Sequence, residues 1–167
     1  SIHSINKKLA TFAANQVKDA EITMLDLNDY EMPIYSIDKE NANGIPQLAQ
    51  DFKAEIKSAD GLIISFAEHN GAYSAAFKNI MDWISRLEGS TWEDKPMYLL
   101  ATSPGGRGGK SVLDDNNRRL GICAAGVGLF FTHDPAAATA GADDEALGNK
   151  CICNNDRLAD LATGVVA

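Results

Sequence analysis

The chain has 167 residues, of which 45% are hydrophobic and 23% are charged, so it fits a single globular domain with a substantial core. A formal net charge of −8 repels phosphate backbones, which argues against a nucleic-acid partner. The sequence has no apolar run near the roughly 20 residues that span a bilayer, and no charged-then-apolar leader at its start. We therefore expect a cytoplasmic protein with no membrane or nucleic-acid partner.

Three cysteines, Cys123, Cys151 and Cys153, occur in the chain. An odd number in a chain of this length argues against a disulfide framework and for a reducing compartment. Cys151 and Cys153 are separated by one residue, which is too close for the usual zinc knuckle, and no histidine lies nearby. We therefore expect no metal site and interpret these thiols as structural or incidental.

The first third of the chain predicts helix, strand, loop and helix in that order. Apolar residues follow helical spacing over residues 5–17, and a short run of strand-forming residues occupies 22–27. Loop-forming residues come next, namely Pro33, Asn43, Gly44 and Pro46. A second helical stripe covers residues 45–59, with Pro46 acceptable in its first turn.

The middle of the chain contains two buried strands and the clearest helix. The unbroken apolar runs at 62–66 and 97–101 are typical of strands that are buried on both faces of a parallel sheet. Between them, apolar residues at helical spacing predict a helix over 73–87. Three further elements follow: a glycine-rich turn, a weaker helix over 109–120 and a strand over 127–132.

Strands that alternate with helices at this spacing predict βαβ units and a parallel sheet, with ligands at the carboxyl ends of the strands. Two parts of the chain depart from that pattern. The sequence opens on a loop and a helix without a preceding strand, so we expect residues upstream of Ser1. Residues 133–150 have poor periodicity, so we expect a loop there, followed by a terminal helix around 156–163.

The loop before the first predicted helix combines a helix cap with positive charge. Ser4 is a favourable N-cap residue, and Asn6 offers its amide nearby. Lys7 and Lys8 place positive charge in a first turn, where it opposes the helix macrodipole. A bound anion would account for that placement, because a helix N-terminus presents N–H groups to phosphate. A solvated turn with an ordinary cap accounts for these residues equally well.

The loop after the first buried strand, residues 67–74, concentrates polar and aromatic side chains at the expected ligand edge. It contains Glu68, His69, Asn70, Gly71 and Tyr73. Its backbone N–H groups and the Asn70 amide suit a planar heteroaromatic ring, and Gly71 allows a close approach of the backbone. A structural explanation is a hydrogen-bonded pair of Glu68 and His69 in the turn, with Tyr73 as the first core residue of its helix. The position of the loop favours ligand binding.

The loop after the second buried strand, residues 103–111, is rich in glycine. So many glycines cost backbone entropy, which a close approach to a ligand would justify. The end of this loop, Gly109-Lys110-Ser111, also matches the end of a nucleotide-binding P-loop, G-x-x-x-x-G-K-[ST]. The register disfavours that alternative, because the first glycine of the motif falls on Pro104.

Taken in this order, the three loops and the helix between them resemble the NAD(P)H-dependent FMN reductase family, which includes chromate, quinone and azo-dye reductases. The resemblance spans about residues 4–120 and is carried by four segments: Ser4-Ile5-Asn6, Glu68-His69-Asn70-Gly71-Ala72-Tyr73, Phe77-Lys78-Asn79-Ile80-Met81-Asp82-Trp83 and Ser103-Pro104-Gly105-Gly106-Arg107-Gly108-Gly109. The sequence lacks the Gly-Ser and the arginine of the family's phosphate loop, and His69 stands where many members have tyrosine.

The resemblance implies a flavodoxin-like α/β fold, a three-layer sandwich whose parallel five-stranded sheet has the order 2-1-3-4-5 and lacks its first strand here. Residues 1–167 would form one FMN-binding domain, with FMN held without a covalent bond and NAD(P)H as co-substrate. The implied flavoprotein is an oxidoreductase that passes electrons to a small acceptor such as a quinone, an azo compound, chromate or free flavin. Family members often form dimers or tetramers through the helix that here carries Trp83 and Arg86, so we expect a homodimer or homotetramer.

The resemblance also assigns cofactor-binding residues by position. Ser4 and Asn6 belong to the phosphate loop; Glu68, His69, Asn70 and Tyr73, with Gly71 between them, line the ribityl chain and the flavin ring; Ser103, Gly105, Gly106 and Gly108 flank the other side of the ring. We expect no catalytic residue, because hydride transfer is the chemistry of the cofactor and the protein supplies orientation and electrostatics. Arg107 would meet the charge of reduced flavin or the 2′-phosphate of NADPH, or lie on the surface without either role.

Two alternatives remain open. A flavodoxin-like electron carrier would bind FMN without oxidising a nicotinamide itself, and an acidic surface would also suit it. A P-loop-type nucleotide binder would bind no flavin at all.

Overall fold

The structure is a computed structural model that describes residues 3–119, 129–132 and 164–166. Within these residues the chain forms α-helices, a 3₁₀ helix and strands that alternate along the sequence. The loop expected over 133–150, the helix expected around 156–163 and all three cysteines lie outside the described residues.

The strands form one mixed sheet, in which five run parallel in the order β1-β6-β2-β4-β5 and β3 pairs with β2 in the antiparallel direction. They are β1 (Ile22–Met24), β2 (Leu62–His69), β3 (Ala72–Tyr73), β4 (Met97–Ser103), β5 (Leu129–Thr132) and β6 (Gly164–Val166). The longest pairing joins β2 to β4, from Leu62 opposite Met97 to Ala67 opposite Thr102. These two strands contain the apolar runs that predicted burial on both faces, and they are buried.

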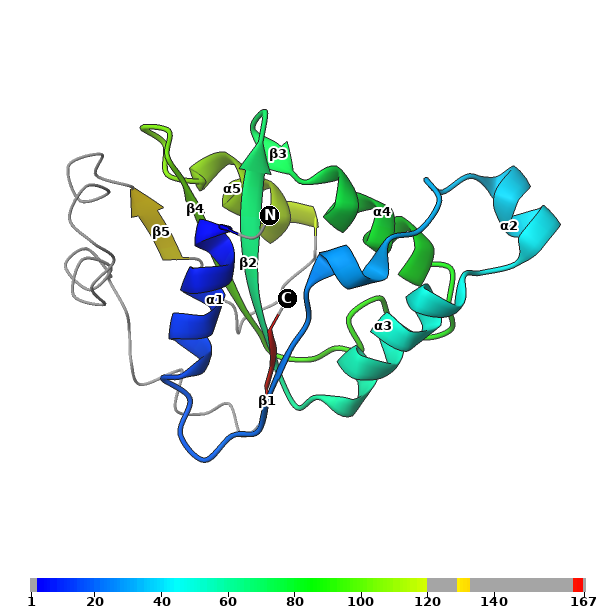
Figure 1. Cartoon of the computed structure of the whole chain (residues 1–167), viewed down its shortest axis with the longest axis horizontal. Helices are drawn as coiled ribbons and strands as arrows, with labels where there is room; N and C mark the ends of the chain where they lie inside the picture. The colour runs from blue at the N-terminus through cyan, green and yellow to red at the C-terminus, as the bar shows by residue number, and fades with distance from the viewer. Residues whose placement is uncertain (1–2, 120–128, 133–163, 167) are drawn as a thin grey trace.

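Helices cover both faces of the sheet. They are α1 (Ile5–Ala14), the 3₁₀ helix η1 (Leu27–Tyr30), α2 (Ile37–Asn43), α3 (Gln47–Ser58), α4 (Ala75–Ile84) and α5 (Lys110–Arg119). The α1 helix packs on one face, and α3, α4 and α5 pack on the other, so two separate clusters of buried residues lie on the two sides of the sheet. Figure 1 shows α1 in front of the sheet and α5 behind it.

The buried side of α1 consists largely of alanine. Ser4 caps the helix, since its hydroxyl accepts a hydrogen bond from the backbone N–H of Lys7 at 3.2 Å. The buried residues between α1 and the sheet are Leu9, Ala10, Ala13, Ala14, Ile63, Tyr98 and Leu100. Short side chains let the helix lie close to the strands, so its first turn reaches the carboxyl ends of β2 and β4.

The core on the opposite face is larger and more aromatic. Its buried side chains include Phe52 and Ile56 of α3, Ile80 and Trp83 of α4, Val112 and Leu113 of α5, and Ile64 and Leu99 of the sheet. Burial of each large apolar side chain contributes roughly 1.5–3 kcal/mol. This face therefore supplies the larger share of the hydrophobic stabilisation and holds the strands that carry the functional loops.

The segment 33–46, predicted as a loop, contains the helix α2. This helix begins after Ser36, whose hydroxyl accepts a hydrogen bond from the backbone N–H of Lys39. It ends at Gly44, which has a φ of +73°. Asn43 and Gly44, which the sequence pattern assigns to a loop, are the last residue of this helix and its glycine stop signal.

Two predicted elements are shorter in the structure. The helix predicted over 73–87 is α4, which begins after its cap, Ser74, whereas Tyr73 lies in β3. The strand predicted over 22–27 ends with β1, because Asp26 caps the 3₁₀ helix η1. Both changes place polar side chains at the carboxyl edge of the sheet, where the sequence pattern predicted regular structure.

The sheet position that the predicted order assigns to a first strand is held by β6, from the other end of the sequence. In this position β6 runs parallel to both neighbours, with Val165 opposite Thr23 of β1 and opposite Leu62 of β2. Figure 1 shows β6, in dark red, beside β1. The observed sheet therefore differs from the predicted parallel sheet in two ways. The β6 strand takes the position of the first strand, and β3 adds an antiparallel pair.

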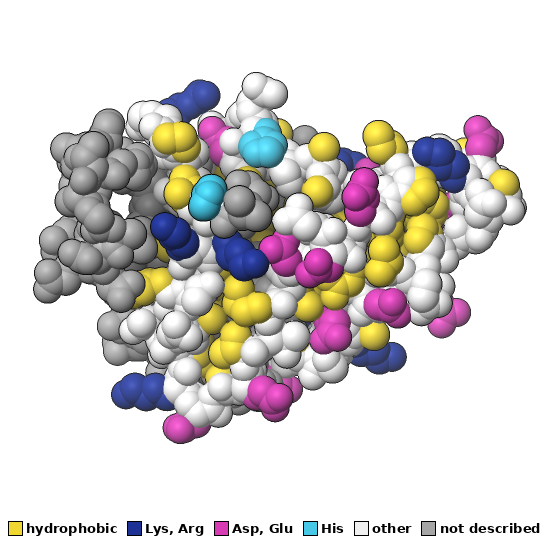
Figure 2. Space-filling view, viewed as in Figure 1, with side chains coloured by type: hydrophobic (Ala, Val, Ile, Leu, Met, Phe, Trp, Pro, Cys, Tyr) yellow, Lys and Arg dark blue, Asp and Glu magenta, His cyan; other side chains and the backbone are white. Residues whose placement is uncertain are grey.

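The surface combines acidic and apolar regions. Figure 2 shows acidic side chains spread over one face of the molecule, with hydrophobic side chains gathered over α4 and the segment before α2. Among the described residues, the most exposed large apolar side chains are Ile34 and Ile37, at 78% and 52%. In the part of the chain that the structure describes, no helix is both long and apolar enough to cross a membrane.

Candidate functional site

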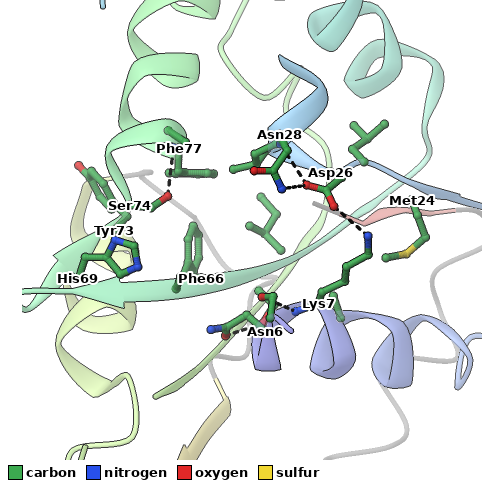
Figure 3. Close-up of a pocket in the computed structure, with 18 residues that line it drawn as sticks. Asn6, Lys7, Met24, Asp26, Asn28, Phe66, His69, Tyr73, Ser74 and Phe77 are labelled. Atoms are coloured by element: carbon green, nitrogen blue, oxygen red, sulfur yellow. Dashed lines mark hydrogen bonds and ion pairs between the residues drawn. The ribbon is translucent and has the colours of Figure 1, made fainter. Parts of the chain in front are cut away.

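A cavity of about 310 Å³ opens at the carboxyl edge of the sheet. It is surrounded by the first turns of α1, the segment that follows β1, the carboxyl half of β2 and the start of α4. Its lining residues are Ser4, Asn6, Lys7, Ala10, Met24, Leu25, Asp26, Leu27, Asn28, Ile64, Ser65, Phe66, Ala67, His69, Tyr73, Ser74, Ala76 and Phe77. Figure 3 shows Lys7 and Asp26 toward one end of the cavity and Tyr73 and Phe77 toward the other.

The cavity lies beside the edge of β2, at the point where β6 stops. The β6 strand pairs with β2 at Leu62 and Ile63, and the next four residues of β2, 64–67, all line the cavity. Because successive side chains of a strand point to opposite faces, a cavity that touches four in a row adjoins the strand's edge and lies in the plane of the sheet. Open α/β sheets bind ligands in such crevices, outside the carboxyl ends of the strands.

One end of the cavity carries an ion pair between α1 and the turn after β1. The Nζ of Lys7 lies 2.8 Å from Oδ2 of Asp26, and Asp26 also accepts hydrogen bonds from the backbone N–H and the side-chain amide of Asn28. The hydrogen bond from Lys7, followed by that from the Asn28 backbone, lowers the pKa of the Asp26 carboxyl to about 2. Lys7 therefore has a carboxylate partner, so its place in the first turn does not by itself require a bound anion.

The other end of the cavity is aromatic. The rings of Phe66 and Phe77 meet edge to face with 5.0 Å between their centroids, and Tyr73 lies 5.7 Å from Phe77. Trp92 stacks against Phe77 at 6.0 Å. His69 is exposed at the end of β2 and also lines the cavity. Aromatic rings held in this way provide an apolar wall for a planar ligand.

Asn6 lies between α1 and the sheet with its amide bonded to both central strands. Its Nδ2 donates to the backbone carbonyl of Thr102 at 2.9 Å. Its Oδ1 accepts from the backbone N–H of Thr102 at 2.9 Å and from the hydroxyl of Ser65 at 3.0 Å. The side chain is buried, so this residue of the predicted phosphate loop is already engaged within the protein.

The Asn70-Gly71 pair is a tight hairpin turn between β2 and β3. Asn70 and Gly71 have φ values of +53° and +79°, and His69 and Ala72 pair across the turn. Positive φ at both central residues is characteristic of the hairpin turn that favours Asn-Gly, a sequence signal that the ligand-binding interpretation overlooked. A Cβ on Gly71 would meet nothing within 4 Å, so the backbone conformation requires glycine here, and no close approach within the protein does.

Glu68 connects the loop after β2 to the helix that follows the glycine-rich loop. Its Oε2 accepts a hydrogen bond from the backbone N–H of Val112 at 3.1 Å, in the first turn of α5. A carboxylate is favourable there because the N-terminus of a helix carries partial positive charge. The structural explanation drawn from the sequence paired Glu68 with His69, whereas the structure gives Glu68 a partner in α5.

The glycine-rich loop after β4 contains two kinds of glycine. Gly108 and Gly109 are buried, with φ values of +58° and +85°. A Cβ on Gly109 would lie 2.8 Å from the Cβ of Ala101, so packing against β4 already requires glycine at this position. Residues 105–106 are exposed, and a side chain there would meet almost no protein atoms. Residues 105–106 therefore leave open space for a ligand.

The structure divides the predicted cofactor residues into two groups. Those that line the cavity are Ser4, Asn6, His69 and Tyr73. Those at the ends of β2 and β4 outside its lining are Glu68, Asn70, Gly71, Ser103, Gly105, Gly106 and Gly108. The prediction omitted several lining residues, above all Asp26, Asn28, Phe66 and Phe77. The first two follow β1 directly, and the same carboxyl-edge rule would have found them if the predicted strand had ended at Met24.

The chemistry of the cavity suits an elongated ligand with one anionic and one planar apolar end. The first N–H groups of α1 have no partners within the helix and attract an anion, and the opposite wall is aromatic. Across the described ranges, no group of three or more His, Cys, Asp and Glu side chains is placed to hold a metal ion.

Comparison with known proteins identifies similar sequences. The profile of a family described as NADPH-dependent FMN reductase matches residues 1–127. A 2-hydroxy-1,4-benzoquinone reductase from Burkholderia sp. is 35% identical over 123 residues, which are 72% of this chain and 63% of that protein. An NADPH:quinone oxidoreductase from Arabidopsis thaliana is 32% identical over 119 residues, 71% of this chain and 57% of that protein. The chain thus spans less than two thirds of the length of these relatives.

A solved structure has a similar fold. The chain is similar to FerB, a flavoenzyme NAD(P)H:(acceptor) oxidoreductase from Paracoccus denitrificans, with a TM-score of 0.60 and 25% sequence identity. The similarity covers 78% of this chain and 70% of FerB.

Proposed function

Because the chain belongs to the NADPH-dependent FMN reductase family, we propose that it binds FMN and passes electrons from NAD(P)H to a small acceptor. The cavity carries this proposal, since it joins a helix N-terminus and the Lys7–Asp26 ion pair at one end to an aromatic wall at the other. FMN has matching ends, an anionic phosphate and a planar ring system. The chain covers less than two thirds of the length of these curated relatives, so the activity of the whole protein is part of the proposal.

We infer a flavodoxin-like domain over residues 1–167 with the strand order 2-1-3-4-5, in which β6 takes the place of the first strand. In that order FMN binds at the switch point between the first and third strands. The corresponding place here is the gap between the end of β6 and the carboxyl half of β2. The cavity lies in that gap, which supports the assignment.

The phosphate of FMN is assigned to the first turn of α1. Ser4, Asn6 and Lys7 line the cavity there, next to the positive end of the helix dipole. The volume of about 310 Å³ lies at the lower limit of the roughly 300–1,000 Å³ that small-molecule sites occupy. The residues present therefore fit the anionic end of the cofactor, without the glycine, serine and arginine that the family pattern adds.

The flavin ring is assigned to the space between the hairpin after β2 and the loop after β4. His69 and Tyr73 line its cavity side, with Glu68, Asn70 and Gly71 in the same hairpin. Ser103, Gly105, Gly106 and Gly108 approach from the other loop, of which 105–106 are exposed. Bound FMN would accept electrons from NAD(P)H and pass them to the acceptor. The chain's own residues would orient the ring and exclude water, so we assign no catalytic residue.

The absorbance of the purified protein is the decisive test of this proposal. We expect a yellow protein, or one that becomes yellow with added FMN, and NADPH oxidation when a benzoquinone is supplied without any partner protein. Azo compounds, chromate and free flavin are the further acceptors to compare. A protein that holds flavin but leaves NADPH unoxidised would be an electron carrier. A colourless protein that binds ATP would be a P-loop nucleotide binder, although Lys110 pairs with Asp114 at 2.7 Å.

We also propose a cytoplasmic homodimer or homotetramer that meets through the region of α4. Trp83 is 1% exposed, and its Nε1 donates to a backbone carbonyl 2.8 Å away in the segment before α2, so it is not a surface contact. Arg86 pairs with Glu40 of α2 at 3.0 Å. The exposed Ile34 and Ile37 support a contact at this surface. Light scattering should report a dimer or tetramer, and a monomer at micromolar concentration would exclude this assembly.

A further inference from the structure

The amide of Asn6 forms with Thr102 the pair of hydrogen bonds that an antiparallel strand would form. Its Nδ2 donates to the carbonyl of Thr102 and its Oδ1 accepts from the N–H of the same residue, both at 2.9 Å. This two-way exchange with one residue is the pattern of a hydrogen-bonded pair in an antiparallel ladder. The side chain is only 7% exposed, so solvent cannot easily replace either bond.

These bonds lie where the two central strands begin to separate. The register of β2 and β4 ends at Ala67 opposite Thr102, and Oδ1 of Asn6 also accepts from the hydroxyl of Ser65 on β2 at 3.0 Å. One side chain from α1 therefore holds the ends of both strands. Its removal would leave buried polar groups of Thr102 without partners, which costs more than the bonds themselves contribute.

The three elements that Asn6 joins carry different walls of the site. Ser4, the cap of α1, and Lys7, in its first turn, line the end of the cavity that is assigned to the phosphate. Phe66 follows Ser65 and belongs to the aromatic wall. Ser103 follows Thr102 and begins the glycine-rich loop. The distances between these walls thus depend on one buried amide.

We propose that the side chain of Asn6 is a positioning group, which sets α1 against the carboxyl ends of β2 and β4, and is not a ligand of the FMN phosphate. The backbone N–H of Asn6 remains part of the first helical turn that is assigned to the phosphate. A phosphate needs hydrogen-bond donors, but Oδ1 of Asn6 is an acceptor and already accepts two hydrogen bonds. Nδ2 uses one of its two N–H groups for the carbonyl of Thr102, so the buried side chain has one N–H left. The inference rests on the proposed binding of FMN for its functional consequence. The contact between Asn6 and Thr102 can be tested without flavin.

Amide hydrogen exchange in the flavin-free protein tests the contact itself. In Asn6→Ala, the amide of Thr102 should exchange at least about tenfold faster, because it loses its acceptor. Asn15→Ala is the matched control, since Asn15 is an exposed residue at the other end of α1, and it should leave Thr102 unchanged. An unchanged exchange rate at Thr102 in Asn6→Ala would overturn the inference, whether or not the protein binds flavin.

Paired affinities for FMN and riboflavin test the functional consequence. If Asn6 is a positioning residue, Asn6→Ala should lower the affinities for FMN and riboflavin by a similar factor, about tenfold. Ser65→Ala should lower both affinities by a smaller factor. A loss for FMN alone would make Asn6 a phosphate ligand and overturn the inference. A lower melting temperature with unchanged affinities for both flavins would also overturn it, because Asn6 would then serve stability alone.

The same measurements separate this inference from the proposed function. If the wild-type protein binds neither flavin, the proposed function fails. The exchange rate of Thr102 in that protein still decides whether Asn6 connects α1 to β4.

Discussion

The loops after β2 and β4 both contain glycines at positive φ, but for different physical reasons. In the hairpin after β2, Gly71 stands in open space and is needed for its φ of +79°. In the loop after β4, Gly109 has a φ of +85° and also packs against Ala101. The first glycine serves a local turn, whereas the second lets a loop lie on the strand that precedes it. A glycine-rich loop at a ligand edge is therefore not evidence of ligand contact at every glycine.

Replacement of Gly109 by alanine should have the largest effect. The new Cβ would lie 2.8 Å from the Cβ of Ala101 and 3.2 Å from its carbonyl carbon, at a backbone conformation that alanine disfavours. We expect a loss of about 3 kcal/mol in the free energy of unfolding, from strain and overpacking together. Urea unfolding followed by tryptophan fluorescence measures it. A loss below about 1 kcal/mol would show that the loop moves away from β4 at little cost.

Replacement of Gly71 by alanine tests the other half of the comparison. The same positive φ is present, but nothing lies within 4 Å of the new Cβ. We expect a loss of about 1 kcal/mol, the conformational cost alone. The same urea titration applies, and a loss as large as that of Gly109→Ala would mean that the hairpin glycine is also constrained by packing.

The Lys7–Asp26 ion pair, at the end of the cavity assigned to the phosphate, should make the free energy of unfolding depend on pH. Neither glycine replacement should change that dependence. The pKa of Asp26 falls from 3.8 to about 2, so its charge stabilises the folded state above pH 3.8. That contribution is lost as the pH falls through about 2.

Asp26→Asn should cost about 1 kcal/mol at neutral pH, a value limited by the solvent exposure of the pair. Asparagine keeps the cap of η1, so the variant removes mainly the charge. The difference in unfolding free energy between wild type and variant should shrink as urea titrations move from pH 6 toward pH 2.5. A difference that stays constant over that range would assign the loss to the cap.

Replacement of Gly106 by alanine should have the smallest effect on stability. A methyl group on this residue would meet no protein atom within 4 Å, and its φ is not positive, so we expect a change below about 0.5 kcal/mol. If the flavin ring lies against this part of the loop, FMN affinity should fall in the same variant. Fluorescence titration with FMN measures it, and Gly71→Ala provides the reference for a glycine in the facing loop.

Much of the framework followed from local sequence pattern. The apolar runs at 62–66 and 97–101 predicted the two central strands, and helical spacing predicted α1, α3 and α4 within a few residues. The loops after those strands were placed at the carboxyl edge from the same reasoning. The helix α2 was missed although Ser36 and Gly44 mark its ends, because the turn-forming residues around it were interpreted together as a loop.

The roles of the site residues were harder to predict, because one residue type serves several purposes. The Asn-Gly pair was interpreted as a ligand contact, yet the same two residues form a hairpin turn. The sequence leaves a bound anion and a solvated, capped turn equally open for Lys7, and the structure gives this residue a partner in Asp26. Each interpretation was chemically sound, and only the neighbours in space distinguish between the alternatives.

The sequence by itself determined the alternation of strands and helices and the three loops at one edge of the sheet, since these depend on periodicity and turn residues within short windows. Only the tertiary structure decided that β6 lies between β1 and β2, that Glu68 caps α5, and that Asn6 holds Thr102, 96 residues away. The physical reason is that such pairings depend on backbone groups and amides common to the whole chain. They leave no local pattern, and the fold alone brings the partners together.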